Sequence, residues 1–468
     1  MDLHMHTPGS SDYEQPDTTY LDILKKAEEK GVDILAVADH NTVAGYRALL
    51  SEIRRLEWLE SEKRLQKSEQ NDLDEYRRLT EKILILPGFE FTATFGFHVL
   101  GIFSPETSVR AIEHILIQLK VPVDQLDTGA TEVGATSDVL TAYRLIDEAG
   151  GLVIAAHANS SHGVAMRGLR FGGQTKIAWT QDPHLHALEV TDLEKRGRRT
   201  TAKFYDGSKP EYPRRMHCIQ GTDAHRLEAD PRRTERLGVG DRLTEIRLPE
   251  RSFEAILEAL KGNDFSVTRP ARAMTAAPFD HIGEAREAGN TIVQAFHDSA
   301  TRRGGRLYAI LADSVAFANT NGGTIYVGAS SNAKNPISGV SDTNQVMQVI
   351  RHDIENKVTP PLDYKMDVQE SGDKKLVRIQ VPRGQDPPYV IDGSKIYVRN
   401  ESETNLAVRD EIVELVKRAL AGRPQEVDVE ATDSMRVSPP RTGVEIAEAV
   451  DRKGKRYYAM CDLRKNNR

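Results

Sequence analysis

The chain has 468 residues but only two cysteines, Cys218 and Cys461, and no long apolar run. Two cysteines are too few for a disulfide framework or a thiolate metal site, and they suit a reducing compartment. No apolar stretch approaches the length that crosses a membrane, and the N-terminus lacks the basic-then-apolar pattern of a signal peptide. We therefore expect a cytoplasmic protein that does not bind membranes.

The chain also has no excess of positive charge. It contains 63 Lys and Arg and 70 Asp and Glu, which gives a formal net charge of −7. This balance excludes a globally basic nucleic-acid-binding protein, so contacts with phosphate must come from local clusters. The G-x4-G-K-[ST] phosphate loop is absent as well, so no motif supports ATP as a cofactor. Histidine, by contrast, is concentrated early in the chain, with eleven of the 14 among the first 225 residues.

Residues 1–265 alternate short apolar runs with helical patterns such as "SDVLTAYRLIDEAGG" (137–151). Buried strands joined by helices predict a mainly parallel sheet, either open or closed into a barrel.

The remainder divides by composition. Residues 266–283 carry prolines and small residues and are predicted to be a linker. Residues 284–421 form a second unit, in which a helix leads through an Asn-Gly-Gly turn into a strand. A second linker is predicted at 422–441, and residues 442–468 are predicted to form a β-hairpin that turns at Lys453-Gly454.

The opening residues "MDLHMHTPGSSDYE" place His4 and His6 on the same side of a predicted strand, because strand residues two apart share a face. Alone, such a pair is more often an exposed polar edge strand than a metal site. The other apolar runs, however, also end in polar groups: Asp39 with His40, Glu90, His98, His157, Asp192, and Asp223 with His225. In parallel α/β folds functional groups gather at the carboxyl ends of the strands, so the repeated pattern predicts one site.

Imidazole and carboxylate groups without thiolates suit Zn²⁺, Mn²⁺ or Fe²⁺. The number of such groups exceeds what one ion uses, because a catalytic zinc takes about three protein ligands plus water. We therefore expect two or three divalent ions, an arrangement that can clamp a phosphate and activate water.

The strings "DLHMHTPGSSD", "AVADHNT", "PGFE", "FGFH", "IAAH" and "GTDAH" together resemble the PHP (polymerase and histidinol phosphatase) superfamily over residues 1–265. "HTPGSSDY" and "GTDAHR" are most similar to its TrlF-like branch. The resemblance implies a distorted (β/α)7 barrel with a trinuclear site at its C-terminal mouth and with Glu90 bridging two ions. The implied metal ligands are His4, His6, Asp12, His40, Glu90, His98, His157, Asp223 and His225. No ligand of the set is missing, which favours an active enzyme.

Three loops that follow His157, Asp192 and His225 are rich in Arg and Lys, and we expect them to rim the mouth and favour a polyanionic substrate. Arg226 is the candidate phosphate contact, and His157 or His225 is the candidate to protonate the leaving oxygen.

Other polar groups near the motifs have less defined roles. Asp2, Asp39 and Asp192 either orient imidazoles or are structural. Three histidines near the motifs match no ligand position and are expected at the surface or the rim: His162, His184 and His186.

"AFANTNGGTIYVG", "VTPPL" and "IYVRNES" resemble the Schlafen-like, AlbA-type domain over about residues 284–420. The resemblance implies nucleic-acid binding, and ATP binding has been proposed for this family. Members with nuclease activity carry an acidic cluster where this chain has "VQAFHDS" (293–299), so no second nuclease centre is expected. We expect instead a smaller α+β module that binds DNA or RNA, or serves assembly, and delivers the nucleic acid to the barrel.

These observations predict a metal-dependent phosphodiesterase or nuclease that acts on DNA or RNA, in an architecture that would suit defence against phage. Two alternatives stay open: a small-molecule phosphomonoesterase of histidinol-phosphatase type, and a nucleic-acid-binding regulator with a structural metal site. The sequence leaves open DNA versus RNA, endo- versus exonuclease action, the identity of the metal, and whether a homo-oligomer or a partner protein is needed.

Overall fold

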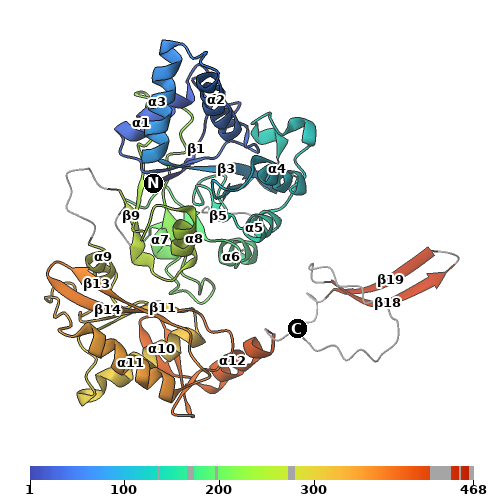
Figure 1. Ribbon diagram of the computed structural model, residues 1–468. Helices are drawn as coiled ribbons and strands as arrows, with labels where there is room; N and C mark the ends of the chain where they lie inside the picture. Colours follow the sequence, from blue (N-terminus) through green and yellow to red (C-terminus); the bar gives the residue numbers. More distant parts are fainter. Residues whose placement is uncertain are drawn as a thin grey trace. The chain divides into compact units, whose positions relative to one another are not determined.

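The computed structural model describes residues 1–134, 136–165, 173–195, 199–271, 280–421, 444–452 and 455–462. The chain forms two compact units, Met1–Gly422 and Arg423–Arg468. The larger unit contains a barrel, built by residues 1–271, and an AlbA-like part, built by residues 280–421 (Figure 1).

A seven-stranded sheet forms the barrel, and its strands are neighbours in chain order. They are β1 (Asp2–Met5), β2 (Ile34–Val37), β3 (Leu84–Thr92), β4 (His98–Ile102), β5 (Leu152–Ala155), β6 (Ala187–Glu189) and β7 (His217–Ile219). Met5 forms a bridge with Ala224, and the amide of His6 donates to the Ala224 carbonyl at 3.0 Å. The first strand is thereby joined to the segment that follows the last one, so the sheet curls into a barrel.

One strand distorts this barrel. β4 is antiparallel to both of its neighbours, whereas the other pairs are parallel. Only the short turn at Thr94–Gly96 separates β3 from β4, and a tight turn can join only antiparallel strands, because a parallel pair needs a long crossover. The predicted α/β class with a distorted (β/α)7 barrel is confirmed.

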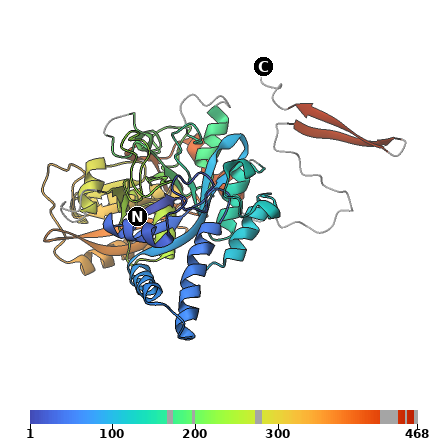
Figure 2. The same cartoon turned by 90° about the horizontal axis from the view of Figure 1, so that it is seen from above.

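Helix α8 (Phe253–Lys261) closes the barrel interior at one end. The other helices cover the outside of the barrel: α1 (Tyr20–Glu29), α2 (Ala44–Ser61), α3 (Lys67–Lys82), α4 (Val109–Gln118), α5 (Val139–Glu148), α6 (Gly173–Gln181) and α7 (Thr201–Phe204). The predicted helix at 137–151 is α5, and its start is fixed by Asp138, whose carboxylate accepts hydrogen bonds from the amides of Leu140 and Thr141. Figures 1 and 2 show α2 and α3 lying side by side and projecting from the sheet.

Side chains on the two faces of the sheet form separate cores. Along β3, Leu86 belongs to the core inside the barrel, which α8 closes through residues such as Ile256. Phe89 and Phe91 belong to the core between the sheet and the outer helices. Successive strand residues alternate between faces, so Glu90 shares the inner face with Leu86 and lies nearer the carboxyl end of the sheet. The apolar floor of the barrel therefore supports a polar upper layer.

The rest of the larger unit begins with β8 (Thr244–Ile246), which pairs with β9 (Thr268–Pro270). The AlbA-like part contains α9 (His281–Ala288), β10 (Gln294–His297), α10 (Arg306–Asn319), β11 (Gly323–Val327), α11 (Thr343–Lys357), β12 (Val358–Thr359), β13 (Lys365–Ser371), β14 (Lys374–Val381), β15 (Val390–Ile391), β16 (Lys395–Asn400), β17 (Glu403–Leu406) and α12 (Arg409–Ala421). It has two four-stranded sheets, ordered β10-β11-β14-β13 and β12-β15-β16-β17, and α10 packs against strands of both. The predicted helix–turn–strand segment is confirmed as α10 and β11.

Gly322 occupies the turn between α10 and β11 with a φ of +73°. A Cβ atom here would lie 2.8 Å from both the backbone nitrogen of Arg383 and the carbonyl oxygen of Val381, so both the backbone conformation and the close packing require glycine.

The smaller unit contains β18 (Val444–Arg452) and β19 (Lys455–Asp462), which pair antiparallel and confirm the predicted C-terminal hairpin. The predicted turn at Lys453-Gly454, the linker at 422–441 and most of the linker at 266–283 lie outside the described residues. The division into domains at these linkers stays a prediction. Within the described part of the chain, no helix is both long enough and apolar enough to span a membrane.

Candidate metal centre

The nine predicted ligands come together at the carboxyl end of the barrel strands. His4 and His6 come from β1 and the residue after it, His157 follows β5, and Asp223 follows β7. His98 begins its strand instead of ending one, and it reaches the same end because β4 runs antiparallel. The remaining predicted ligands join them from loops or from inside a strand: Asp12, His40, Glu90 and His225.

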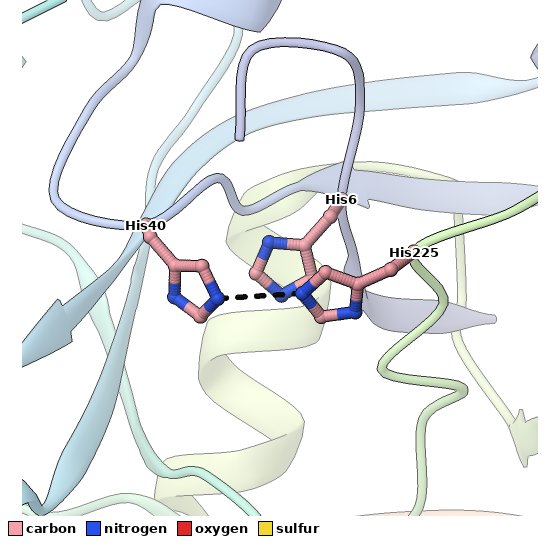
Figure 3. A group of neighbouring side chains, drawn as sticks. All are labelled: His6, His40 and His225. Atoms are coloured by element: carbon pink, nitrogen blue, oxygen red, sulfur yellow. Dashed lines mark hydrogen bonds between the residues drawn. The ribbon is translucent and has the colours of Figure 1, made fainter. Parts of the chain in front are cut away.

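Three imidazoles form one group, His6, His40 and His225 (Figure 3). Nε2 of His40 lies 3.3 Å from Nε2 of His225. Oδ2 of Asp12 lies 3.3 Å from each of these two nitrogens, so a carboxylate faces the group from the loop after β1.

A second group consists of His4, His6, Glu90 and Asp223. Nε2 of His4 lies 3.2 Å from Nε2 of His6, and Oδ1 of Asp223 lies 3.3 Å from the former and 3.4 Å from the latter. His6 thus belongs to both groups and holds them adjacent.

Glu90 occupies the middle of the cluster and is fully buried. Its Oε1 lies 2.8 Å from Nδ1 of His98 and 3.1 Å from Nε2 of His157, and its Oε2 lies 2.8 Å from Nδ1 of His40. The last pair is not aligned as a hydrogen bond, and neither Oε2 of Glu90 nor Nδ1 of His40 has a hydrogen-bond partner among the described residues. A buried polar atom without a partner calls for an explanation, and a metal ion between such atoms would supply one.

The spacing of the donor atoms fits metal coordination. Four ligands about 2.0–2.1 Å from a tetrahedral ion are about 3.3 Å from one another. Five donor pairs of the two groups lie between 3.2 and 3.5 Å apart, which matches this spacing. Nitrogen and carboxylate oxygen donors without thiolates suit Zn²⁺, Mn²⁺ and Fe²⁺, so the residues present fit divalent ions.

The charges of the cluster also favour the binding of metal ions. Burial alone would raise the pKa of Glu90, but the charges of His98 and His4 hold it well below the usual range. Burial alone would lower the pKa of His4, but Glu189, Asp223 and Glu90 raise it well above the usual value. The field that retains a proton on His4 also attracts cations, so metal ions and protons compete for its ring nitrogen.

Glu189 is a site residue that the sequence analysis missed. Its side chain is 1% exposed, its Oε2 lies 2.8 Å from Nδ1 of His4, and the same oxygen accepts a hydrogen bond from the amide of His157 at 2.9 Å. This contact fixes the ring of His4 with Nε2 pointing into the cluster, as carboxylates beside metal-binding histidines commonly do. The signal in the sequence was a single carboxylate inside the apolar strand "ALEV".

Asp39, one of three carboxylates with an undecided role, acts on an imidazole through a hydroxyl. It accepts hydrogen bonds from the Thr7 amide at 2.7 Å and from Oγ of Ser10 at 2.9 Å. Oγ of Ser10 in turn lies 2.9 Å from Nδ1 of His6. Asp39 therefore positions the loop that presents His6.

The other two carboxylates stabilise loops. Asp2 accepts from the Thr222 hydroxyl at 2.5 Å and from the His4 amide at 3.3 Å, and so it fixes the backbone before Asp223. Asp192 accepts from the amide of Thr201 at 2.9 Å. Neither carboxylate has a hydrogen bond to an imidazole in the described part of the chain.

Arg226, the predicted phosphate contact, faces two carboxylates. Its guanidinium nitrogens lie 3.0 Å from Glu14 and 3.0 Å from Asp230, so its charge is already balanced.

A cavity of about 460 Å³ adjoins the cluster, and its lining includes His157, His162, Asp223 and Arg242. Arg242 is the one Lys or Arg in this lining, and its Nε donates to the carbonyl of Gly221 at 2.6 Å.

Part of the predicted basic rim lies elsewhere. Lys209, Arg214 and Arg215 line a different cavity together with His186 and His217. His217 begins β7 and His186 directly precedes β6, so this cavity lies at the amino ends of these strands, opposite the metal ligands. A loop that leaves the carboxyl end of β6 must return to the amino end of β7, and its last residues therefore lie far from the mouth.

Two of the histidines assigned to the surface or rim lie at the same amino ends. His184 and His186 both contact Asp147, at 2.8 and 3.1 Å, which is a structural arrangement away from the site.

A comparison with protein families supports the predicted resemblance of the second part of the chain. Residues 294–408 match the family model described as Schlafen, AlbA_2, which confirms the resemblance predicted there. The search of curated proteins gives no match.

Three solved structures are distantly similar to this chain. A proposed metal-dependent phosphoesterase from Bifidobacterium adolescentis is 18% identical, with a TM-score of 0.31, over 55% of this chain and 94% of that one. An amidohydrolase from Chromobacterium violaceum is 15% identical, with a TM-score of 0.23, over 40% and 75%. The DIP2311 protein from Corynebacterium diphtheriae is 16% identical, with a TM-score of 0.22, over 27% of this chain and only 24% of its own length.

Proposed function

We propose that the barrel is a metal-dependent phosphodiesterase of the PHP type that cleaves nucleic acid. The convergence of six imidazoles and three carboxylates on one end of the barrel, around the buried Glu90, is the observation that carries the proposal. Such a donor set exceeds what one ion uses, and two or three divalent ions of Mn²⁺, Zn²⁺ or Fe²⁺ are the expected cofactors.

In this proposal the nine predicted ligands hold the ions, and Glu189, Asp39 and Ser10 fix the orientation of the imidazoles. When bound, divalent ions activate water and offset the negative charge of the attacked phosphate. Arg242 would contact a phosphate oxygen from the cavity, because a guanidinium binds phosphate well and this one has no carboxylate within ion-pair distance among the described residues.

Protonation of the leaving oxygen needs a group outside the metal ligands. Nε2 of His225 faces His40 and Asp12, and Nε2 of His157 faces Glu90, so both rings point into the cluster. His162 lines the same cavity, and its Nδ1 contacts the carbonyl of Gly96 at 3.1 Å, which leaves Nε2 for the substrate. We therefore prefer His162 as the proton donor.

Nucleic acid is the proposed substrate because the AlbA-like part belongs to a family for which nucleic-acid binding is expected. If the cleaved nucleic acid is foreign, the protein would have an antiviral role. The proposal of such a role is based only on the combination of a phosphoesterase barrel with an AlbA-like part.

The test uses the full chain with Mn²⁺ and end-labelled single- and double-stranded DNA and RNA, with a chelator as a control. We expect metal-dependent cleavage that disappears in the His4→Ala/His6→Ala variant and persists in the matched control His114→Ala, since His114 is an exposed histidine of α4. Turnover of a phosphomonoester such as p-nitrophenyl phosphate without cleavage of any nucleic acid would instead favour the small-molecule phosphatase. Metal and nucleic-acid binding without any turnover would favour a regulator with a structural metal site.

A further inference from the structure

A second cavity, of about 1120 Å³, lies between the barrel and the AlbA-like part. Its barrel side is formed at the amino ends of β6 and β7, and its other side includes the α10–β11 turn at Asn321 and the turn after β16 at Glu401. The volume slightly exceeds the range typical of small-molecule sites, about 300–1,000 Å³, so a ligand of triphosphate size has room. The cavity shares no residue with the metal cluster or with the cavity beside it.

Its lining is strongly basic. Seven of the lining residues are Lys or Arg, and Glu401 is the one carboxylate. Two of the seven pair with carboxylates, since Lys261 lies 2.6 Å from Asp147 and Arg399 lies 3.1 Å from Asp313. In the described part of the chain the other five have no ion pair with a carboxylate: Lys209, Arg214, Arg215, Arg383 and Arg418.

Most of these cations contact carbonyl oxygens or an aromatic ring, which balance a positive charge less well than a carboxylate does. Nη1 of Arg418 donates to the Asn319 carbonyl at 2.7 Å, and the guanidinium of Arg215 stacks 4.6 Å from the centroid of Phe265. Phe265 stacks in turn on His217, at 4.2 Å between ring centroids, so a layered platform supports Arg215. Burial, followed by the charge of Arg383, lowers the pKa of Arg418 to about 10. Neighbouring positive charges without anions between them are costly unless an anion binds.

We propose that this cavity binds a small ligand with adjacent phosphate groups, in the size class of a nucleoside triphosphate. Arginine forks match phosphate oxygens, and five unbalanced cations around one cavity suit phosphates clustered on one molecule. A nucleic-acid strand spaces its phosphates along a line and would need a basic groove instead. Because the ligand would touch both the barrel and the AlbA-like part, it would stabilise their contact and act as an effector rather than as the substrate.

The experiment measures binding of ATP and of inorganic tripolyphosphate to the full chain by calorimetry, with EDTA present so that the metal centre is empty. We expect one site per chain for either phosphate compound, no binding of adenosine, and a rise of the unfolding temperature with tripolyphosphate concentration. Arg215→Gln and Arg383→Gln should each weaken binding about tenfold or more, because each removes a charge-assisted hydrogen bond. Equal affinities for ATP and tripolyphosphate would assign recognition to the phosphates alone, and tighter ATP binding would add the nucleoside.

Two controls separate this site from the rest of the molecule. Arg110→Gln, at an exposed arginine of α4, and His157→Ala, in the metal cluster, should leave both affinities unchanged. The proposal is overturned if neither compound binds, if both cavity variants bind normally, or if the His157→Ala variant loses binding. It is also overturned if single-stranded DNA displaces ATP and loses affinity in the same two variants, which would make the cavity a nucleic-acid surface. None of these results depends on hydrolysis, so failure here leaves the phosphodiesterase proposal standing.

Discussion

Replacing Glu189 with glutamine tests whether the metal cluster depends on a residue that is not itself a ligand. The substitution keeps the shape of the side chain but removes its charge. One carboxylate oxygen of Glu189 now serves both Nδ1 of His4, at 2.8 Å, and the amide of His157, at 2.9 Å. Glutamine can place its single acceptor oxygen at the same position, but both hydrogen bonds then lose the carboxylate charge. Its NH₂ group would replace the other oxygen, Oε1, which is buried without a hydrogen-bond partner among the described residues.

The expected magnitude follows from these contacts. A hydrogen bond to a charged group contributes about 1.5–3 kcal/mol. Loss of the carboxylate that orients a metal-binding histidine typically lowers metal affinity about 10- to 100-fold, which corresponds to about 1.4–2.7 kcal/mol. The two ranges agree, so we expect Glu189→Gln to bind Zn²⁺ about 10- to 100-fold more weakly than the natural chain.

The assay is a competition titration of the full chain with a fluorescent zinc chelator, beside urea unfolding in EDTA. Glu60→Gln is the matched control, because Glu60 is a surface carboxylate that pairs with Arg77. Zinc affinity within twofold of the natural chain, in a variant that folds normally, would refute the positioning role of Glu189. A loss of stability in EDTA without a loss of affinity would make the residue structural only.

Three further predictions concern other parts of the barrel. Arg242→Gln should lower kcat/KM for a phosphodiester about 10-fold or more with unchanged metal content, measured by steady-state kinetics and elemental analysis; an unchanged kcat/KM would exclude a phosphate contact. Burial, with the charge of Lys261 second, lowers the pKa of His186 to about 4. Since an unfolded histidine titrates near 6.5, the unfolded chain binds the extra proton between these values, and stability should fall by up to about 3 kcal/mol as pH drops from about 6.5 to 4. The His186→Asn variant should show a flatter pH dependence of its urea midpoint, and an identical slope would contradict the assignment. Leu86→Ala should lower the free energy of unfolding by about 2–5 kcal/mol in urea, because Leu86 is fully buried in the inner core; a loss below 1 kcal/mol would mean that the barrel interior repacks.

The strand-end pattern predicted the site well because it depends on periodicity. Parallel strands bring their carboxyl ends together whatever the details of the packing, so residues such as His40, His157 and Asp223 could be expected at one site. The full set of nine candidate ligands, Asp12 included, came instead from the resemblance to the PHP superfamily. His98 fitted the pattern for a different reason, because it begins an antiparallel strand. Glu189 could not be found this way, since a carboxylate inside a buried strand has no distinguishing spacing.

Surface charge was the least predictable property. The sequence shows that Arg226 is next to His225 but not that Glu14 and Asp230 neutralise it, because the three acquire their contacts only in the folded chain. The basic loop before β7 was misplaced for a geometric reason. Proximity in sequence to a strand end fixes only the first residues of a loop, and Arg214 and Arg215 belong to its return to the opposite end of the barrel.

The pairing between the segments after β1 and β7, which closes the barrel, determines when the candidate metal ligands can come together. The amide of Asp223 donates to the carbonyl of His4 at 2.8 Å, so candidate ligands more than 200 residues apart share one hydrogen-bonded edge. During synthesis the first histidines leave the ribosome long before Asp223 and His225 do, and domains fold as units once their chain is available. A chain interrupted anywhere in this interval holds an incomplete donor set. The complete donor set therefore exists only after synthesis has passed His225, and the order of the chain makes assembly of the site a late event in the synthesis of the barrel.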